Sequence, residues 1–183
     1  MRRLETMLPG VCQIELDVHR DSRGFFVEQF RADRLAALGI ADVFVQENHS
    51  RSVGRTLRGM HWQWRRPQAK LLRVLAGAIF DVVVDVRRGS PTFARWLGTE
   101  MRADDFRWIY VPAGFAHGFV VLSDAADVEY KCSDVYDPGG EAGLPWNDPA
   151  VAIHWPVADP LLSARDRAHP PLDPDRHDLI AYS

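Results

Sequence analysis

Short runs of hydrophobic residues, several of them alternating with polar residues, recur along the chain and predict a series of β-strands. In VCQIELDV, at 11–18, every second side chain is apolar, as on a strand with one buried face. Twelve prolines and thirteen glycines punctuate the sequence between such runs, where they favour turns. We therefore expect strands over 11–18, 24–30, 43–50, 56–64, 69–75, 77–87, 95–101, 107–112, 117–122, 126–132 and 150–155.

Signals for helices are few along this chain. The segment RADRLAAL, at 31–38, predicts one helix that Gly39 would end, and a short turn is expected to begin at Ser163. Many short strands with so little helix favour an all-β sandwich, jelly roll or barrel, because these architectures hide strand edges. The interior of a small barrel can also hold one ligand.

The length of 183 residues suits a single domain, 1–183, and the tail from residue 168 onward, rich in proline and charge, is expected to wrap the surface. The 22 basic and 25 acidic residues give a formal charge of −3 without any block of like charge. Binding to nucleic acid or to an anionic membrane would need such a block, so we expect neither partner. An anionic ligand would have to be held by a local pocket.

The cysteine content points to a reducing compartment. Cys12 and Cys132 are too few for a disulfide framework and are not spaced as a metal pair, so we expect both to be core thiols. No apolar segment follows the basic N-terminus, and no run of about 18 apolar residues occurs, so we expect neither a signal peptide nor a membrane span. We therefore expect a cytoplasmic protein.

The segment ADVEYKC, at 126–132, supplies the first candidate for chemistry. Alternation places Tyr130 on the same inward strand face as Val128 and Cys132. A buried tyrosine is by default a core residue whose hydroxyl has found a partner. The alternative is a general acid that donates its phenolic proton, and this role requires a base across the same cavity.

Two histidines are candidates for that base, His61 in TLRGMHWQ and His117 in PAGFAHGF, although lone histidines are more often structural. Their segments resemble the two cupin motifs, because PAGFAH matches PxGxxH and HWQ stands where HxH is expected. A metal-binding cupin needs roughly three imidazoles and a carboxylate. Here Gln63 replaces one histidine, no glutamate follows at the expected distance, and the cation Lys70 lies nearby. We therefore expect a site without a metal.

Two further basic residues, Lys70 and Arg58, could serve an anionic substrate. Lys70 is one of only two lysines and falls in the apolar-leaning segment AKLLRVL. It is either a solvated charge at a strand edge or a point charge aimed at an oxyanion that forms during a reaction. Strict alternation puts Arg58 and His61 on opposite faces of one strand, but a bulge at Gly59 would bring both inward.

The remaining polar residues gather in DSRGFFVEQF, at 21–30, and QENHSRS, at 46–52. Either segment could simply be the polar face of a strand. Combined with Arg58, their side chains form a plausible set for a diphosphate and a pyrimidine, since guanidinium groups bind phosphate and amides or carboxylates read a base edge. The residues in question are Arg23, Glu28, Gln46, Glu47 and Asn48.

Together these segments resemble one family, the dTDP-4-dehydrorhamnose 3,5-epimerases, which are cupin-like sugar-nucleotide epimerases. The likeness covers nearly the whole chain and runs in order through DSRGFFVEQF, QENHSRS, TLRGMHWQ, KLLRVLAGAIFDVVVDVRRGSPTFARW, VPAGFAHGFVVLSDAADVEYKC, GLPWNDP and LLSARD. It implies a double-stranded β-helix of the jelly-roll barrel type. It also implies a homodimer, in which exchanged N-terminal strands complete each site, and no cofactor, metal or organic.

The resemblance also implies roles for individual residues. His61 resembles the family's catalytic base, Asp166 the carboxylate that orients it, and Tyr130 the acid. Lys70 resembles the residue that faces the C4 oxygen of the sugar. The substrate contacts implied are Arg58 and His117 for sugar and phosphate, Tyr136 for stacking on thymine, and Arg23, Phe26, Glu28, Gln46, Glu47, Asn48, Glu141 and Arg165, some of which would serve the partner subunit.

The implied reaction is epimerisation of dTDP-4-dehydro-6-deoxy-D-glucose at C3 and C5 to dTDP-4-dehydro-L-rhamnose, through an enolate that is reprotonated from the opposite face. The alternative is a mono-epimerase of a dTDP-4-keto-6-deoxysugar, acting at C3 alone or at C5 alone. A non-catalytic sugar-nucleotide binding module is disfavoured, because binding alone needs no base facing an acid. The chain departs from the family pattern at Glu47, Arg165, Val135 and the shortened QAK at 68–70, which bears on substrate preference.

Overall fold

The computed structural model describes residues 1–182, which form thirteen β-strands, two short α-helices and one 3₁₀ turn. The strands are β1 (Arg2–Glu5), β2 (Cys12–Glu15), β3 (Val18–Asp21), β4 (Gly24–Val27), β5 (Gln46–Val53), β6 (Leu57–Gln63), β7 (Lys70–Ala76), β8 (Ala78–Asp85), β9 (Trp96–Arg102), β10 (Arg107–Val111), β11 (Phe115–Val121), β12 (Ala125–Cys132) and β13 (Glu141–Gly143). The helices are α1 (Ala32–Ala37) and α2 (Ala164–Arg167), and the turn is η1 (Ala103–Asp105). The expected all-β fold with a few short helices is confirmed.

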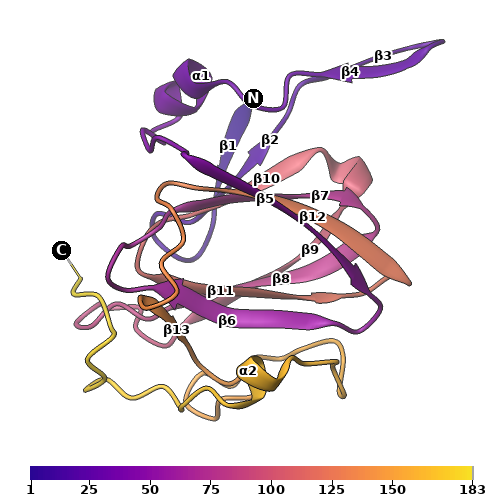
Figure 1. The fold of residues 1–183 in the computed structure, drawn as a ribbon. Helices are drawn as coiled ribbons and strands as arrows, with labels where there is room; N and C mark the ends of the chain where they lie inside the picture. The colour runs from indigo at the N-terminus through magenta and orange to yellow at the C-terminus, as the bar shows by residue number, and fades with distance from the viewer. Residues whose placement is uncertain (183) are drawn as a thin grey trace.

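Two antiparallel sheets lie face to face in a jelly-roll sandwich (Figure 1). The upper sheet has the order β1-β2-β10-β7-β12-β5, and the lower sheet has the order β13-β6-β11-β8-β9. Their inward side chains form the main core, in which Leu72 and Val128 from the upper sheet share one cluster with Val83 and Phe119 from the lower sheet. The space between the sheets is therefore apolar except where polar residues interrupt it.

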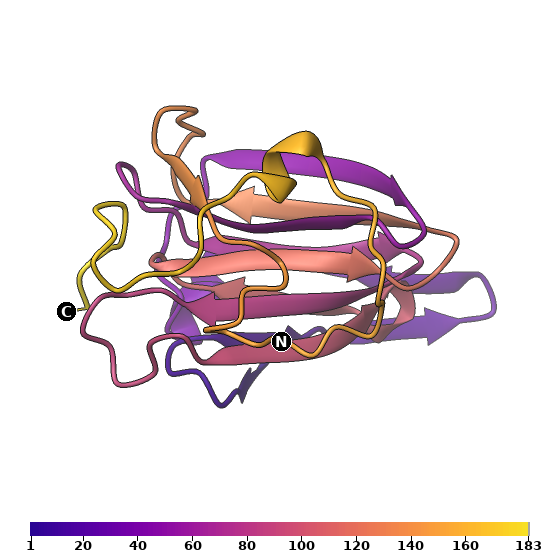
Figure 2. The same cartoon turned by 90° about the horizontal axis from the view of Figure 1, so that it is seen from below.

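The lower sheet is buried on both faces. Along β8, Val83 faces the upper sheet, whereas Val82 and Val84 belong to a second cluster with Leu172 and Leu179 from the C-terminal segment. Figure 2 shows this segment crossing the outer face of the sheet from below. Burial on both faces explains why β8 is an almost unbroken apolar run rather than an alternating one.

The strand expected over 150–155 is wrong. Val151 and Ile153 are buried in the second cluster and alternate with the exposed residues Ala152 and His154, which reproduces the pattern of a strand. The segment nevertheless pairs with no strand of the described chain: 150 and 151 lie in a turn, and 152–155 are irregular. An irregular segment that packs on a sheet can therefore show the same alternation of buried and exposed residues as a strand with one buried face.

The N-terminal region also departs from the expected strands. The run at 11–18 is divided, because β2 ends at Glu15 and β3 begins at Val18, after which β3 and β4 form a separate two-stranded hairpin. Figure 1 shows this hairpin extending beyond the sandwich. The side chain of Phe26 is 69% exposed there. The short strands β1 and β13 carry no alternation long enough to predict and were not expected.

Both helical expectations are confirmed. Helix α1 buries Leu35 and is followed by Gly39, whose φ of +82° suits the turn that ends it. Helix α2 follows Ser163, whose hydroxyl accepts a hydrogen bond from the backbone N–H of Asp166 at 3.0 Å. Within residues 1–182, no helix is long and apolar enough to cross a membrane.

Candidate active site

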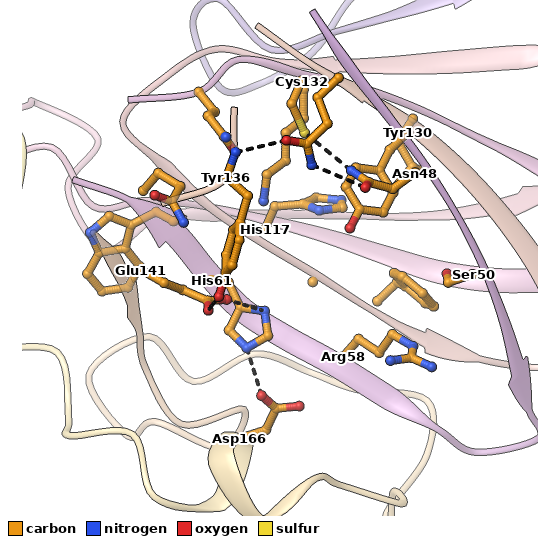
Figure 3. A pocket seen from close by; sticks show the side chains of 18 of the residues that line it. Asn48, Ser50, Arg58, His61, His117, Tyr130, Cys132, Tyr136, Glu141 and Asp166 are labelled. Carbon is orange, nitrogen blue, oxygen red and sulfur yellow. Dashed lines mark hydrogen bonds and ion pairs between the residues drawn. The ribbon is translucent and has the colours of Figure 1, made fainter. Parts of the chain in front are cut away.

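A cavity of about 430 Å³ lies between the two sheets, within the size range of small-molecule sites. Asn48 and Tyr130 point into it from the upper sheet, and Arg58 and His61 point into it from the lower sheet (Figure 3). Of the predicted site residues, those that line it are His61, Tyr130, Asp166, Lys70, Gln46, Asn48, Arg58, His117, Tyr136, Glu141 and Arg165.

His61 and Asp166 form the tightest pair of this site. Nε2 of His61 lies 2.7 Å from Oδ1 of Asp166, which is itself 4% exposed. Burial acts to raise the pKa of Asp166, but its contacts with His169 and His61 outweigh burial and hold that pKa well below its usual range. The carboxylate therefore stays ionised and accepts a hydrogen bond from Nε2–H, which leaves Nδ1 of His61 free to take up a proton.

The environment of His61 favours the neutral imidazole that a base must be. Burial lowers the pKa of His61, and this effect exceeds the opposing contribution of Asp166. Lys70 lowers it further by charge repulsion, whereas Glu141, whose Oε1 lies 3.9 Å from Nδ1, acts in the other direction. An imidazole that is neutral but lies beside a carboxylate can accept a proton and be stabilised once it carries one.

Tyr130 enters the cavity from β12, on the sheet opposite to His61 (Figure 3). Within residues 1–182, its hydroxyl forms no hydrogen bond, in contrast to Tyr110, whose hydroxyl donates to Asp42 at 2.6 Å. Burial raises the pKa of Tyr130, so the phenol keeps its proton at neutral pH. A protonated phenol that faces a cavity is suited to donating that proton to a ligand.

The two lysines have opposite surroundings. Lys131 lies on the outer face of the upper sheet, where Nζ is 2.8 Å from Oε2 of Glu47. Lys70, on the central strand β7, lines the cavity and forms no ion pair with any residue of 1–182. Burial lowers its pKa, and the effect is opposed in part by Cys132 and Glu141. Lys70 is therefore not a solvated edge charge but an amine that lines the cavity without an ion-pair partner among the described residues.

The bulge expected at Gly59 is present. Two residues of β6, Gly59 and Met60, lie opposite one residue of β11, Gly118, since His61 pairs with His117 while Arg58 pairs with Phe119. Gly59 has φ of +135°, and a Cβ there would lie 2.6 Å from Cα of Gly118. The extra residue turns Arg58 to the same side as His61. Nε of Arg58 donates a hydrogen bond to Oγ of Ser52 at 2.9 Å.

Five residues gather at one end of the cavity. Oε2 of Glu141 accepts hydrogen bonds from the hydroxyl of Tyr136 and from Nη1 of Arg165, both at 2.6 Å. The bond to Glu141 raises the pKa of Tyr136. Gln46 accepts from the backbone N–H of Tyr136 at 2.8 Å and donates to Asn48 at 3.1 Å. These contacts hold an aromatic ring and several hydrogen-bonding groups together.

The structure does not bring four of the predicted residues to the cavity of their own chain. Arg23 and Phe26 lie on the β3–β4 hairpin, and Glu28 follows it and accepts a hydrogen bond from Arg34 at 3.0 Å. Glu47 projects from β5 on the face opposite to Asn48, because side chains alternate along a strand. Their contacts with substrate stay predictions.

Several lining residues were missed, and some had a signal. Ser50 continues the alternation of Gln46 and Asn48 along β5, so it could have been found. Asp81 does not itself line the cavity, but it is fully buried 2.7 Å from Nε2 of His117, and it stands out in sequence as an acid inside an apolar strand. Gln63, Gln68 and Cys132 also line the cavity. Gln63 stands at the second histidine position of the HxH motif and Cys132 shares the inward strand face of Tyr130, whereas nothing in the sequence marks Gln68.

One group of side chains within residues 1–182 has donor atoms close enough to suggest a metal. These donor atoms, from His61, Asp166 and His169, lie within 4.8 Å of one another. Each ligand atom of a zinc site lies about 2.0–2.2 Å from the ion. Nε2 of His61 and Oδ1 of Asp166 are hydrogen bonded at 2.7 Å, which leaves no room for an ion between them. These residues fit a proton-transfer pair better than a metal site.

A profile of the dTDP-4-dehydrorhamnose 3,5-epimerase family matches residues 5–174. The chain belongs to this family. Like the family's other members, it is an isomerase of the sugar-nucleotide epimerase type, as the sequence analysis expects. The resemblance identified from the motifs is therefore confirmed across most of the chain.

Relatives from several organisms bear the family's name. A dTDP-4-dehydrorhamnose 3,5-epimerase of Neisseria gonorrhoeae is 51% identical over 90% of this chain, which spans only 51% of that relative's length. One from Methanothermobacter thermautotrophicus is 44% identical, with 93% of this chain and 94% of the relative covered. The family relationship thus holds both for a relative of about the same length as this chain and for one about twice as long.

Solved structures confirm the fold. A dTDP-6-deoxy-D-glucose-3,5-epimerase from Legionella pneumophila, in complex with dTDP-4-keto-L-rhamnose, is 44% identical with a TM-score of 0.96, covering 100% of this chain and 98% of that one. A 3′-monoepimerase from Streptomyces bikiniensis, in complex with dTDP-quinovose, is 38% identical with a TM-score of 0.86, covering 91% and 86%. Double and single epimerases therefore share this fold.

Proposed function

We propose that this protein epimerises dTDP-4-dehydro-6-deoxy-D-glucose at C3 and C5 to give dTDP-4-dehydro-L-rhamnose. The observation that carries the proposal is the placement of a base and an acid on facing sheets. His61, paired with Asp166, enters the cavity from β6, and Tyr130 enters it from β12 (Figure 3). A carbon held between them can lose a proton on one side and receive one on the other, which inverts its configuration.

The 4-keto group of such a sugar makes the protons on C3 and C5 acidic, because the electron pair left behind spreads onto O4. Nδ1 of His61 would accept the proton, and Asp166 would stabilise the imidazolium that results. The charge that develops on O4 needs a nearby cation, and Lys70 lines the cavity without a partner among the described residues. The Tyr130 hydroxyl would then reprotonate the carbon, and the phenolate would recover its proton from solvent.

The nucleotide half of the substrate would be held at the end of the cavity where Tyr136, Gln46 and Asn48 lie. The Tyr136 ring can stack on a pyrimidine, and the amides can bond to the edge of a base. Arg58 and His117 would contact the sugar and the diphosphate, since a guanidinium binds phosphate oxygens in pairs. This arrangement leaves the sugar between His61 and Tyr130.

The test is to incubate the enzyme with dTDP-4-dehydro-6-deoxy-D-glucose in heavy water and to locate deuterium in the product by NMR. Label at both C3 and C5, with both centres inverted, supports the proposal. Label at one carbon only would support the second candidate, a mono-epimerase, which the likeness to a 3′-monoepimerase favours. Product without label at either carbon would contradict both.

We also infer a homodimer in which the β3–β4 hairpin of one protomer completes the cavity of the other. The hairpin extends away from its own sandwich (Figure 1) and exposes Phe26. The side chain of Arg23 is 87% exposed and is paired only with Asp21 among the described residues. A partner protomer would bury this ring and give Arg23 a substrate phosphate to bind.

Complementation between two inactive variants tests the exchange. Arg23→Ala and His61→Asn homodimers are expected to be weak or inactive. In a mixed dimer, one site would combine His61 from the first subunit with Arg23 from the second, so mixing and refolding should restore activity. Activity that does not rise on mixing would contradict the exchange, and a monomer in sedimentation experiments would contradict the dimer.

We place the reaction in the cytoplasm. Cys12 and Cys132 are both buried, as expected of core thiols, and both are free. Burial raises the pKa of Cys12 to about 11, so this thiol is unreactive at neutral pH. Detection of the protein in the cytosolic fraction after cell fractionation would support this assignment, and its recovery outside the cytosol would contradict it.

A further inference from the structure

A second imidazole, that of His169, lies beside the His61–Asp166 pair. Its Nε2 is 3.7 Å from the same oxygen, Oδ1 of Asp166, that binds His61. The rings of His61 and His169 meet edge to face, with centroids 5.3 Å apart and planes at 70°. The side chain of His169 is 12% exposed, and its Nε2 is buried with no hydrogen-bond partner among the described residues. A polar atom is thus buried against a carboxylate without a full hydrogen bond.

The position of the His169 ring is set by its neighbours. It lies on Gly143, where a Cβ would come within 2.5 Å of the ring, and Gly143 pairs with His61 across strands β13 and β6. Nη1 of Arg176 donates to the carbonyl of Gly143 at 2.9 Å and to that of Pro170 at 3.1 Å, which ties the following segment to β13. The ring therefore has little freedom to move away from Asp166.

Two states of the His169 ring, the neutral tautomer with its proton on Nε2 and the protonated ring, act on Asp166 in the same direction. A neutral ring with its proton on Nε2 points an N–H dipole at the carboxylate and stabilises its charge, while the other tautomer would point a lone pair at it. A protonated ring stabilises the carboxylate more strongly and also repels a proton on His61. Either state weakens the hold of Asp166 on the proton that His61 gains.

We propose that His169 is a positioning residue of the proposed reaction, acting as the second partner of the Asp166 carboxylate and limiting how strongly the pair retains a proton on His61. This proposal rests on the proposed function, in which His61 must release its proton after each turnover. The contact of His169 is among the causes that lower the pKa of Asp166. If Asp166 interacted with His61 alone, it would stabilise the imidazolium more strongly, and His61 would stay protonated to a higher pH.

Other charged groups near the pair must be held constant in a test. Nε of Arg165 lies 3.9 Å from Oδ1 of Asp166, and Lys70 disfavours a proton on His61. Glu141 favours that proton. Substitutions at position 169 alone leave these three groups unchanged, so a shift in the titration of His61 can be assigned to His169.

The experiment compares His169→Phe, which keeps a ring against Gly143 but removes the N–H, with His169→Gln, which restores an amide N–H without a titrating group. The matched control is His177→Phe, because His177 also meets an aromatic ring, Trp64, edge to face but is not near Asp166. Two quantities are measured: the acid limb of kcat/KM against pH, and the NMR titration of the His61 ring in the free enzyme. A thermal melt checks that each variant is folded.

His169→Phe is expected to move the acid limb and the His61 titration to higher pH by roughly half a unit to one unit, while the activity on the plateau changes by less than about twofold. His169→Gln should stay close to wild type, and His177→Phe should not shift. A limb that stays in place in His169→Phe, or a uniform loss of activity without a shift, would overturn the proposal. If His169→Phe does not fold, His169→Ala is measured in the same way and judged by the same outcomes.

The NMR titration separates this inference from the proposed function. It needs no substrate, so it reports on His169 even if the wild-type protein incorporates no deuterium into the sugar. A wild-type enzyme that is inactive would contradict the proposed function alone. A His61 titration that is unchanged in His169→Phe would contradict the role of His169 alone.

Discussion

The His61–Asp166 pair shows how neighbouring groups determine which of two buried titratable side chains carries a charge. Burial alone would neutralise the carboxylate and the imidazolium alike. Because Asp166 has two imidazole nitrogens within 3.7 Å, it remains charged, whereas burial, together with the charge of Lys70, keeps His61 neutral. In the proposed reaction, the pair would supply a base that is neutral at physiological pH and stabilised once it has accepted a proton.

Tyr130→Phe should separate the two proton steps. Abstraction by His61 does not need the phenol, so exchange of substrate protons with solvent should persist within about tenfold, while inversion falls roughly 100- to 10,000-fold. Deuterium exchange and product formation are followed by NMR on the same sample. Tyr110→Phe is the control, because its hydroxyl bonds to Asp42 outside the cavity. Full inversion by Tyr130→Phe would remove this residue from the mechanism.

Lys70 should produce a basic limb in the pH profile. Its pKa is lowered from 10.5 by burial, so as pH rises through that lowered value the cation is lost and kcat/KM falls. The phenol does not account for this limb, since burial raises the pKa of Tyr130 above 10.0. Lys70→Arg keeps its charge and should move the limb upward, whereas Lys70→Ala should lose roughly 100- to 1,000-fold at all pH values.

The control for Lys70→Arg is Lys131→Arg, which changes the other lysine, paired with Glu47 on the outer face. This variant should keep the wild-type profile. A basic limb that stays at the same pH in Lys70→Arg would show that Lys70 does not cause it.

At the scale of elements, β6 is the strand on which the site depends most. Its bulge brings Arg58 and His61 to one face, and this requires the conformation and close approach that only Gly59 allows. The bulge could be predicted from sequence because strict alternation would have separated two residues that a site must bring together. A departure from strict alternation is informative when, as here, candidate site residues lie on both sides of it.

Gly59→Ala should destabilise the fold by about 1–3 kcal/mol for backbone strain, and by more for the clash with Gly118. Gly89→Ala is the matched control, because Gly89 also has a positive φ, of +83°, but a Cβ there meets no atom within 4 Å. The difference in the free energy of unfolding between the two variants, measured by chemical denaturation, gives the contribution of the close approach between Gly59 and Gly118. Equal losses of stability would show that β6 and β11 can separate without cost.

The other elements show where sequence patterns are insufficient. Alternation located β2 and β12, whereas β7 was located as an apolar run because Leu71 and Leu72 are buried on its two faces. The run at 150–155 shows alternation without a partner strand. Strand β13 has three residues, too few for any period, yet it places Glu141 and Gly143 beside His61. Placement of His169 beside Asp166 depends on how the tail folds back, and no local pattern records such a contact.

At the scale of the whole molecule, the C-terminal segment joins the chemistry to the sandwich. It carries Asp166 and His169, and it is attached through Leu172, Leu179 and a hydrogen bond from Nε1 of Trp62 to the carbonyl of Asp178 at 2.8 Å. Its charge and prolines predicted that it would lie on the surface. The apolar residues that anchor it were too widely spaced to be recognised in sequence.

Trp62→Phe should therefore reduce turnover, because it removes that hydrogen bond and loosens the segment that positions Asp166. Trp108→Phe is the control, since Trp108 is equally buried and donates to the carbonyl of Gln29 at the same distance, 2.8 Å, far from Asp166 in sequence. Each change should cost about 1 kcal/mol of stability. Only Trp62→Phe should raise hydrogen exchange over 172–180, and equal effects of both variants on kcat would contradict this link.

Because the proposed acid and base lie on opposite sheets, the melting temperature and the range of substrates should depend on the same residues. Leu72 and Phe119 belong both to the apolar interior and to the wall of the cavity, so the residues that hold the two sheets apart would also set the distance that the proposed proton donor must bridge. An engineered variant with a better filled interior would shorten that span. It would accept smaller sugars, and its melting temperature and its choice of substrate would change together.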